Sequence, residues 1–116
     1  ANYIMFNMRK YERSVLCQFR MGILLLRIET GRYVGEPVEQ RHCRLCNHSS
    51  IEDETHVLFE CTLYNTIRQS QYQELFAEHN NETLNYRLVH IMLNYPRKLA
   101  KCLTQIIMLR RGTIYR

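Results

Sequence analysis

Three cysteines and one histidine recur at close spacing in the middle of the chain, and this pattern constrains the fold more than any other feature. Two residues separate Cys43 from Cys46, nine residues lead on to His56, and four more lead to Cys61. Two cysteines at this spacing can turn both sulfurs onto one ion, while a histidine and a cysteine five positions apart lie about one helical turn apart or bracket a short turn. The four side chains therefore predict one structural Zn²⁺ site of the CCHC zinc-finger type.

A zinc ion at this site would decide whether the region folds. Structural zinc contributes about 10–16 kcal/mol of apparent binding free energy. A domain of this size has a net stability of only about 5–15 kcal/mol. Four protein ligands close the tetrahedral shell and leave no position for water, so the sequence favours a scaffold over a zinc hydrolase.

Other uses of these side chains agree less well with the sequence. His42 and His48 are also close, but His48 follows Cys46 by only two residues and would form a strained chelate, so His56 is the better ligand. A redox pair of Cys43 and Cys46 lacks the strand and helix context of thioredoxin-like proteins. The zinc-deaminase signature is absent, because no proline precedes Cys43.

The two remaining cysteines, Cys17 and Cys102, lie in apolar, helix-like stretches and are predicted to be core thiols. The total of five is odd, which argues against a closed disulfide framework. Reduced cysteines beside a metal site favour an intracellular location.

A chain of 116 residues corresponds to one small domain, residues 1–116. Within it we distinguish a basic N-terminal helix and loop (1–37), the zinc knuckle (38–64) and the C-terminal helices (65–116). Since the first residue is alanine, we expect a piece of a longer protein.

No stretch approaches 18 consecutive apolar residues, so we expect no membrane partner. Asp53 is the only aspartate, which excludes the paired aspartates of a two-metal phosphoryl-transfer centre.

The spacing of apolar residues predicts a mainly α-helical fold with little or no sheet. Helices are expected over residues 3–21, 65–78, 82–94 and from 96 onward. Gly22 should end the first helix, Asn81 should cap the third, and Pro96 should begin the last. Thr55 is expected to cap a short helix carrying His56, and residues 30–37 are predicted to be a loop. The predicted core positions of the first and last helices are Met8, Tyr11, Val15, Phe19, Leu99, Cys102, Leu103, Ile106 and Ile107.

The net charge of +5 is concentrated at the two ends of the chain. Residues 1–41 carry +3, residues 42–80 carry −4 and residues 81–116 carry +6. Basic ends suggest a polyanionic partner, with nucleic acid first, although a solvated surface explains them equally well. The acidic middle makes the knuckle itself a poor phosphate binder. The candidate nucleic-acid-binding residues belong to two basic helix faces: Arg9, Arg13, Arg20, Arg97, Lys98 and Lys101.

Several short motifs surround the four predicted ligands. They are Phe19-Arg20-Met21-Gly22, Thr30-Gly31-Arg32-Tyr33, Cys43-Arg44-Leu45-Cys46, Glu52-Asp53-Glu54-Thr55 before His56, Leu58-Phe59-Glu60-Cys61, then Tyr64 and Arg68. On these motifs the stretch from Arg20 to Arg68 resembles the zinc-binding segment that follows the reverse transcriptase domain in non-LTR retrotransposons. The resemblance implies the same four zinc ligands, a nuclear location, and a role in holding element RNA or target DNA. It implies nothing catalytic, because the polymerase aspartates lie outside such a segment.

Two functions therefore compete. The first is a non-enzymatic, zinc-stabilised module that binds RNA or DNA, with no small-molecule substrate, in which Tyr3, Tyr33 and Tyr115 could stack on unpaired bases. The second is a protein–protein or homodimerisation module that uses the C-terminal helices. The helix expected over 82–94 carries apolar side chains around most of its circumference, more than one core face requires.

Overall fold

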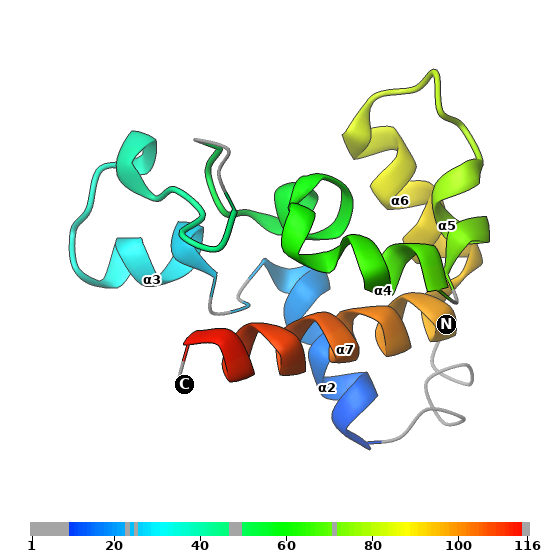
Figure 1. Ribbon diagram of the computed structural model, residues 1–116, viewed down its shortest axis with the longest axis horizontal. Coiled ribbons are helices and arrows are strands. Elements are labelled where there is room, and N and C mark those ends of the chain that lie inside the picture. Colours follow the sequence, from blue (N-terminus) through cyan, green and yellow to red (C-terminus); the bar gives the residue numbers. More distant parts are fainter. Residues whose placement is uncertain (1–9, 23, 25, 47–49, 71, 115–116) are drawn as a thin grey trace.

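The computed structural model describes residues 10–22, 24, 26–46, 50–70 and 72–114, and these residues form a mainly helical fold (Figure 1). In chain order the elements are α2 (Lys10–Met21), α3 (Arg27–Tyr33), the 3-10 turn η1 (Val38–Gln40), the π turn η2 (His56–Glu60), the 3-10 turn η3 (Thr62–Tyr64), α4 (Asn65–Ser70), α5 (Gln73–Ala77), α6 (Leu84–Asn94) and α7 (Pro96–Ile114). Within these ranges the only extended pairing is an isolated antiparallel bridge between His42 and Ile51, so the prediction of a mainly α fold is confirmed. None of the described helices is both long and apolar enough to span a bilayer.

The long helix α7 organises the fold. Pro96 begins it, as predicted, at a position where a missing N–H costs little. α2, α4 and α6 pack against α7, and α2 crosses it in Figure 1. The predicted core positions of α7 are all buried: Leu99, Cys102, Leu103, Ile106 and Ile107. One apolar face of α7 therefore supports most of the other elements.

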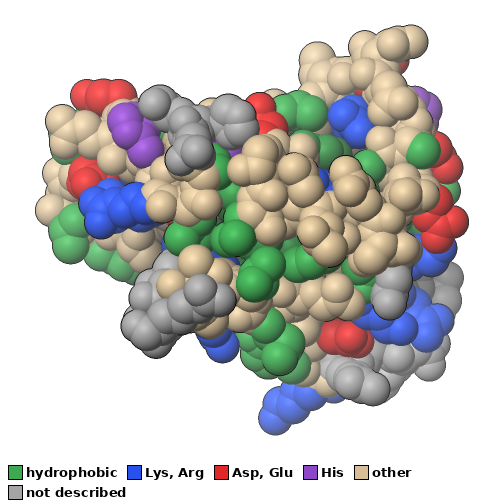
Figure 2. All heavy atoms as spheres, viewed as in Figure 1, with side chains coloured by type: hydrophobic (Ala, Val, Ile, Leu, Met, Phe, Trp, Pro, Cys, Tyr) green, Lys and Arg blue, Asp and Glu red, His purple; other side chains and the backbone are tan. Residues whose placement is uncertain are grey.

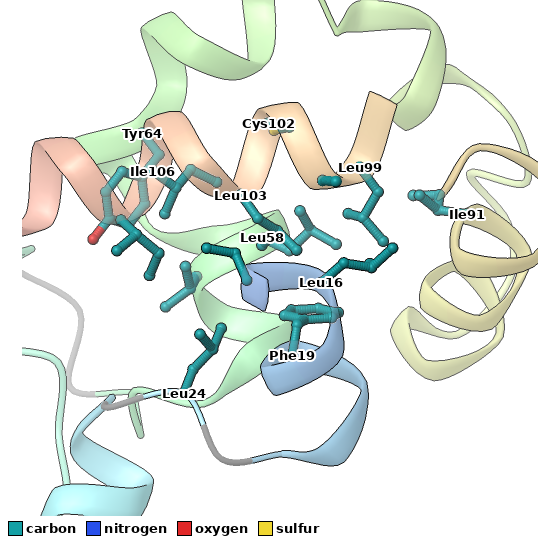
Figure 3. Close-up of a cluster of buried hydrophobic side chains, with 14 of the residues drawn as sticks. Leu16, Phe19, Leu24, Leu58, Tyr64, Ile91, Leu99, Cys102, Leu103 and Ile106 are labelled. Atoms are coloured by element: carbon teal, nitrogen blue, oxygen red, sulfur yellow. The ribbon is translucent and has the colours of Figure 1, made fainter. Parts of the chain in front are cut away.

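The core connects α7 with the segment that carries the predicted metal ligands. Figure 3 shows Leu16 and Phe19 of α2 and Leu58 of η2 pointing toward Leu99 and Leu103 of α7. Each fully buried aliphatic or aromatic side chain stabilises the fold by about 1.5–3 kcal/mol. Since Leu58 lies between His56 and Cys61, this packing also fixes where the metal-ligand turn sits.

Two of the expected buried residues of the first helix are exposed. Val15 and Phe19 are buried as predicted, whereas Tyr11 is 42% exposed and Cys17 is exposed. The reason is that α7 covers the side of α2 that includes Leu16, which is fully buried. The first nine residues, including the predicted core residue Met8, lie outside the described residues.

The boundaries of several helices differ from the sequence prediction. Gly22 ends α2 as expected, with φ at +70°, but part of the predicted loop 30–37 belongs to α3. The first N–H groups of α3 are satisfied from a distant segment, because Arg27 N–H donates to Glu52 Oε1 (2.7 Å). The single helix predicted over 65–78 is divided into α4 and α5.

A different residue caps α6. Thr83 rather than Asn81 is its N-cap, and the Thr83 hydroxyl accepts from the N–H of Tyr86 (3.2 Å).

Candidate metal centre

A short ribbon positions the first two cysteines. The N–H of Cys43 donates to Ser50 O (2.9 Å), and the N–H of Glu52 donates to Arg41 O (3.0 Å), on either side of the isolated bridge. These hydrogen bonds join the two ends of the segment that carries Cys43 and Cys46, just before the helical turn that carries His56. Both cysteines are thereby held near the start of that turn.

A capped helical turn carries the other two residues. Asp53, the only aspartate, accepts from the N–H of His56 (2.9 Å) and from the hydroxyl of Thr55 (2.9 Å). Asp53 rather than Thr55 is therefore the capping residue. The turn closes with the N–H of Cys61 donating to His56 O (2.7 Å), a π-type bond. Side chains five positions apart point about 140° away from each other in an α-helix, so this wider turn brings His56 and Cys61 to the same side.

The four predicted ligands meet in one cluster. The ligand atoms of Cys43, Cys46, His56 and Cys61 all lie within 4.8 Å of one another. The sulfurs of Cys43 and Cys61 are 3.8 Å apart, and Cys46 Sγ lies 3.4 Å from His56 Nε2. A tetrahedral ion with metal–sulfur bonds of about 2.3 Å and metal–nitrogen bonds of about 2.0 Å requires a sulfur–sulfur separation of roughly 3.8 Å and a sulfur–nitrogen separation of roughly 3.5 Å. The cluster therefore has the donor set and the dimensions to hold a metal ion.

Burial controls the protonation of the thiols. Cys43, His56 and Cys61 are buried and Cys46 is partly buried. Desolvation by burial raises the pKa of Cys43, and it raises the pKa of Cys61 to about 12. Without a cation these thiols are neutral at ordinary pH, so a metal ion that binds here displaces their protons.

One carboxylate and two guanidinium groups surround the cluster. Glu52 is fully buried, lies 3.9 Å from Cys43 Sγ, and accepts two hydrogen bonds from Arg110, at 3.0 and 2.7 Å. Arg68 is 8% exposed and donates to the carbonyl oxygens of Val57 (3.2 Å), Leu58 (3.1 Å) and Cys61. The two guanidinium groups offset the charge of Glu52 and the one net negative charge of a divalent ion with three thiolates.

One of these supporting residues, Arg110, was not singled out from the sequence. Its ion pair with Glu52 spans 58 positions of the chain. Nothing in the local sequence could indicate that pair. Arg68 and Tyr64 were part of the noted resemblance, and both are buried in the scaffold, away from solvent.

Of the other two nearby histidines, His42 does not belong to the cluster. It is exposed, and its bridge partner Ile51 is half-buried. His48 lies outside the described residues.

The predicted nucleic-acid-binding residues lie mostly at the surface. Arg13 is half-buried and Arg20 exposed on α2, while Arg97, Lys98 and Lys101 are exposed on α7. Arg9 lies outside the described residues. Figure 2 shows Lys and Arg side chains gathered at the lower right, where the N-terminal end of α7 lies in Figure 1.

Of the tyrosines proposed to stack on bases, only one is described. Tyr33 is 63% exposed, with the Arg32 guanidinium 5.6 Å from its ring centroid. Tyr3 and Tyr115 lie outside the described residues.

Comparisons with known protein families, with curated proteins and with solved structures find no match to this chain. Its function must therefore be argued from its own residues.

Proposed function

We propose that the chain is a non-enzymatic nucleic-acid-binding module whose scaffold is held together by one zinc ion. The zinc assignment is supported by the donor set, since three thiolates and one imidazole suit zinc better than hard cations such as Mg²⁺ or Ca²⁺. Such an ion would supply cross-linking alone. Four protein ligands would occupy its shell, so it would offer no site to a substrate.

The observation that carries the nucleic-acid proposal is the distribution of the positive charges. Six arginines are engaged with other groups of the fold: Arg27, Arg32, Arg41, Arg68, Arg87 and Arg110. None of the predicted nucleic-acid-binding residues that the structure describes is among them, although Lys98 forms an ion pair with Glu74 at the surface. Most of the other described cations lie on α2 and α7, and Arg44 is exposed in the knuckle. The basic helix faces of α2 and α7 therefore hold most of the cations that a partner could contact.

An open cleft gathers part of this surface. It has a volume of about 430 Å³ and is lined by Asn94, Tyr95, Pro96, Arg97, Lys98 and Lys101. It lies at the N-terminal end of α7, where the helix dipole adds positive potential. Three cations and one aromatic side chain in a single cleft are the combination that binds a phosphate backbone beside a base. We therefore propose RNA or DNA as the ligand.

The resemblance of the metal segment gives this proposal a context. A module of this kind would be the C-terminal part of a non-LTR retrotransposon reverse transcriptase or of a protein derived from one. It would hold RNA or DNA without taking part in catalysis. The proposed location is then the nucleus.

A fluorescence-anisotropy titration of the zinc-loaded protein tests the proposal. Labelled single-stranded RNA, hairpin RNA and duplex DNA are titrated at low and at physiological salt. The double variant Arg97→Glu/Lys101→Glu should weaken binding to all three ligands. For single strands its slope of log K against log [salt] should be shallower by roughly 1.4, since each lost phosphate contact removes about 0.7.

The matched control is Arg111→Glu, which adds a carboxylate at the exposed far end of the same helix. Because it reverses one charge and not two, a pure net-charge effect predicts half of the double variant's change in salt slope, and a specific surface predicts less than half. A change of half or more would reduce the effect to net charge and contradict a specific surface. No binding by the folded, zinc-loaded protein at low salt would overturn the proposal.

A second function is favoured by an apolar stripe on α6. Tyr86, Val89 and Leu93 lie on one side of this helix at spacings of three and four, and they are 49%, 49% and 74% exposed. An exposed apolar stripe of this kind fits a protein partner or a second copy of the chain. Light scattering after size exclusion separates the two cases. A stable dimer that Leu93→Glu returns to monomer, without loss of nucleic-acid binding, would establish dimerisation as a further role.

A further inference from the structure

A second group of metal-binding side chains lies where α5 meets α6. Glu78 and His79 follow α5 directly, and His90 lies on α6. One ligand atom from each of the three lies within 4.8 Å of the other two. The group shares no residue with the cysteine cluster, and unlike that cluster it is open to solvent, since Glu78 and His79 are exposed and His90 is half-buried.

The three side chains are already turned toward one another. His90 Nε2 lies 2.8 Å from Glu78 Oε2, and the imidazole rings of His79 and His90 have centroids 4.3 Å apart at an interplanar angle of 72°. His79 has φ at +58°, the only positive φ of a non-glycine residue in the described ranges. A histidine kept in this unfavourable backbone region beside two other ligands is the kind of outlier that occurs at ligand sites.

Neighbouring side chains hold two of the three in place. The hydroxyl of Tyr95 donates to Glu78 Oε1 (2.7 Å), which leaves Oε2 directed at His90. The side-chain amide of Asn94 lies 3.2 Å from His90 Nδ1, so Nε2 is the ring nitrogen that faces the group. Metal-ligating histidines and carboxylates commonly have such outer partners, which fix the ring and the carboxylate before the ion arrives.

We propose that Glu78, His79 and His90 form a second, exchangeable site for a divalent transition-metal ion, with zinc as the ion that the ligand set fits first. Two imidazoles and one carboxylate are three ligands, so the remaining coordination positions are filled by water from the exposed side. The single ring proton of neutral His90, which lies on Nε2 when that atom donates to Glu78, moves to Nδ1 when Nε2 binds the ion, so the imidazole stays neutral. The bound ion cross-links the end of α5 to the middle of α6 and closes the intervening turn.

Metal stoichiometry tests this proposal on the whole chain. Protein is loaded with zinc, desalted, and dialysed against graded free Zn²⁺ before metal analysis. The wild type should bind two ions per chain, with the second ion lost at a free concentration at which the first is retained. The double variant His79→Gly/His90→Gln should bind only one ion. Glycine accepts the positive φ without strain, and glutamine suits a helix, so this variant keeps the fold.

The control variant is His42→Gln, which removes an exposed histidine that belongs to neither group, and it should still bind two ions. Co²⁺ substitution separates the two sites spectroscopically. The cysteine cluster should give intense near-ultraviolet sulfur-to-metal absorption, and the second equivalent should add only weak visible bands. A missing sulfur band would contradict the cysteine metal centre alone. A single equivalent in the wild type, or a second equivalent that survives in the double variant, would overturn the second site.

Discussion

Replacing Arg68 with methionine should weaken both the fold and the metal centre. The Arg68 guanidinium donates to the carbonyls of Val57, Leu58 and Cys61 and to Asn65 Oδ1 (2.7 Å), and it is 8% exposed. The carbonyls of Val57 and Leu58 belong to the end of the π turn, where the helical hydrogen-bond pattern runs out of N–H groups, whereas Cys61 O also accepts from the N–H of Tyr64 (3.3 Å). Methionine keeps most of the aliphatic stem but donates no hydrogen bond.

The size of the effect follows mainly from the carbonyls of Val57 and Leu58, because Cys61 O keeps the N–H of Tyr64. A buried acceptor that loses its partner costs about 1–3 kcal/mol. Burial imposes a desolvation penalty on the Arg68 cation, which is why the pKa of Arg68 is lowered in the folded protein. Replacing Arg68 removes this penalty, and that gain offsets part of the lost stability. We expect Arg68→Met to lower the free energy of unfolding by about 3–5 kcal/mol, a large share of the roughly 5–15 kcal/mol typical of a small domain. Because Cys61 O is one acceptor, metal affinity should fall about 10–100-fold.

Urea unfolding at a fixed free zinc concentration, followed by far-ultraviolet circular dichroism, measures the free energy of unfolding. Competition with a chromophoric chelator measures the metal affinity. Arg111→Met makes the same substitution at an exposed position of α7 and should stay within about 0.5 kcal/mol of the wild type. If Arg68→Met also unfolds within about 0.5 kcal/mol of the wild type, the hydrogen bonds to the π turn are not stabilising, and the reasoning is wrong.

Two further predictions concern the thiols and the buried ion pair. With metal bound, a thiol reagent at pH 8 should label exposed Cys17 quickly and spare Cys102, because burial raises the pKa of Cys102 to about 12. Removing the metal with a chelator should make the three cysteines of the cluster react as well. Fast labelling of all five cysteines with metal bound would contradict the metal centre. Glu52→Gln keeps the oxygen that accepts from the N–H of Arg27 but removes the negative charge opposite Arg110 and the acceptor for Arg110 Nε, so it should cost about 3 kcal/mol in urea unfolding. The double variant Glu52→Gln/Arg110→Met should cost less than the sum of the single variants, and strict additivity would show that the pair is not coupled.

The sequence by itself determined the helical class and the four candidate ligands. Both are local properties. Helical periodicity selected the buried face of α7, and Gly22 and Pro96 marked helix ends through backbone restrictions that act within a few residues. The ligand set could be found because close spacing of soft donors is informative before any folding.

Tertiary structure decided how those ligands meet and what surrounds them. A five-residue separation is compatible with an α-helical turn or a short loop, and the packing of Leu58 in the core together with the cap from Asp53 selects a π turn instead. The exposure of Cys17 and the pairing of Glu52 with Arg110 depend on where α7 crosses the rest of the chain. Such contacts join residues far apart in sequence, so no local pattern encodes them, and only the structure shows which described cations form contacts within the fold.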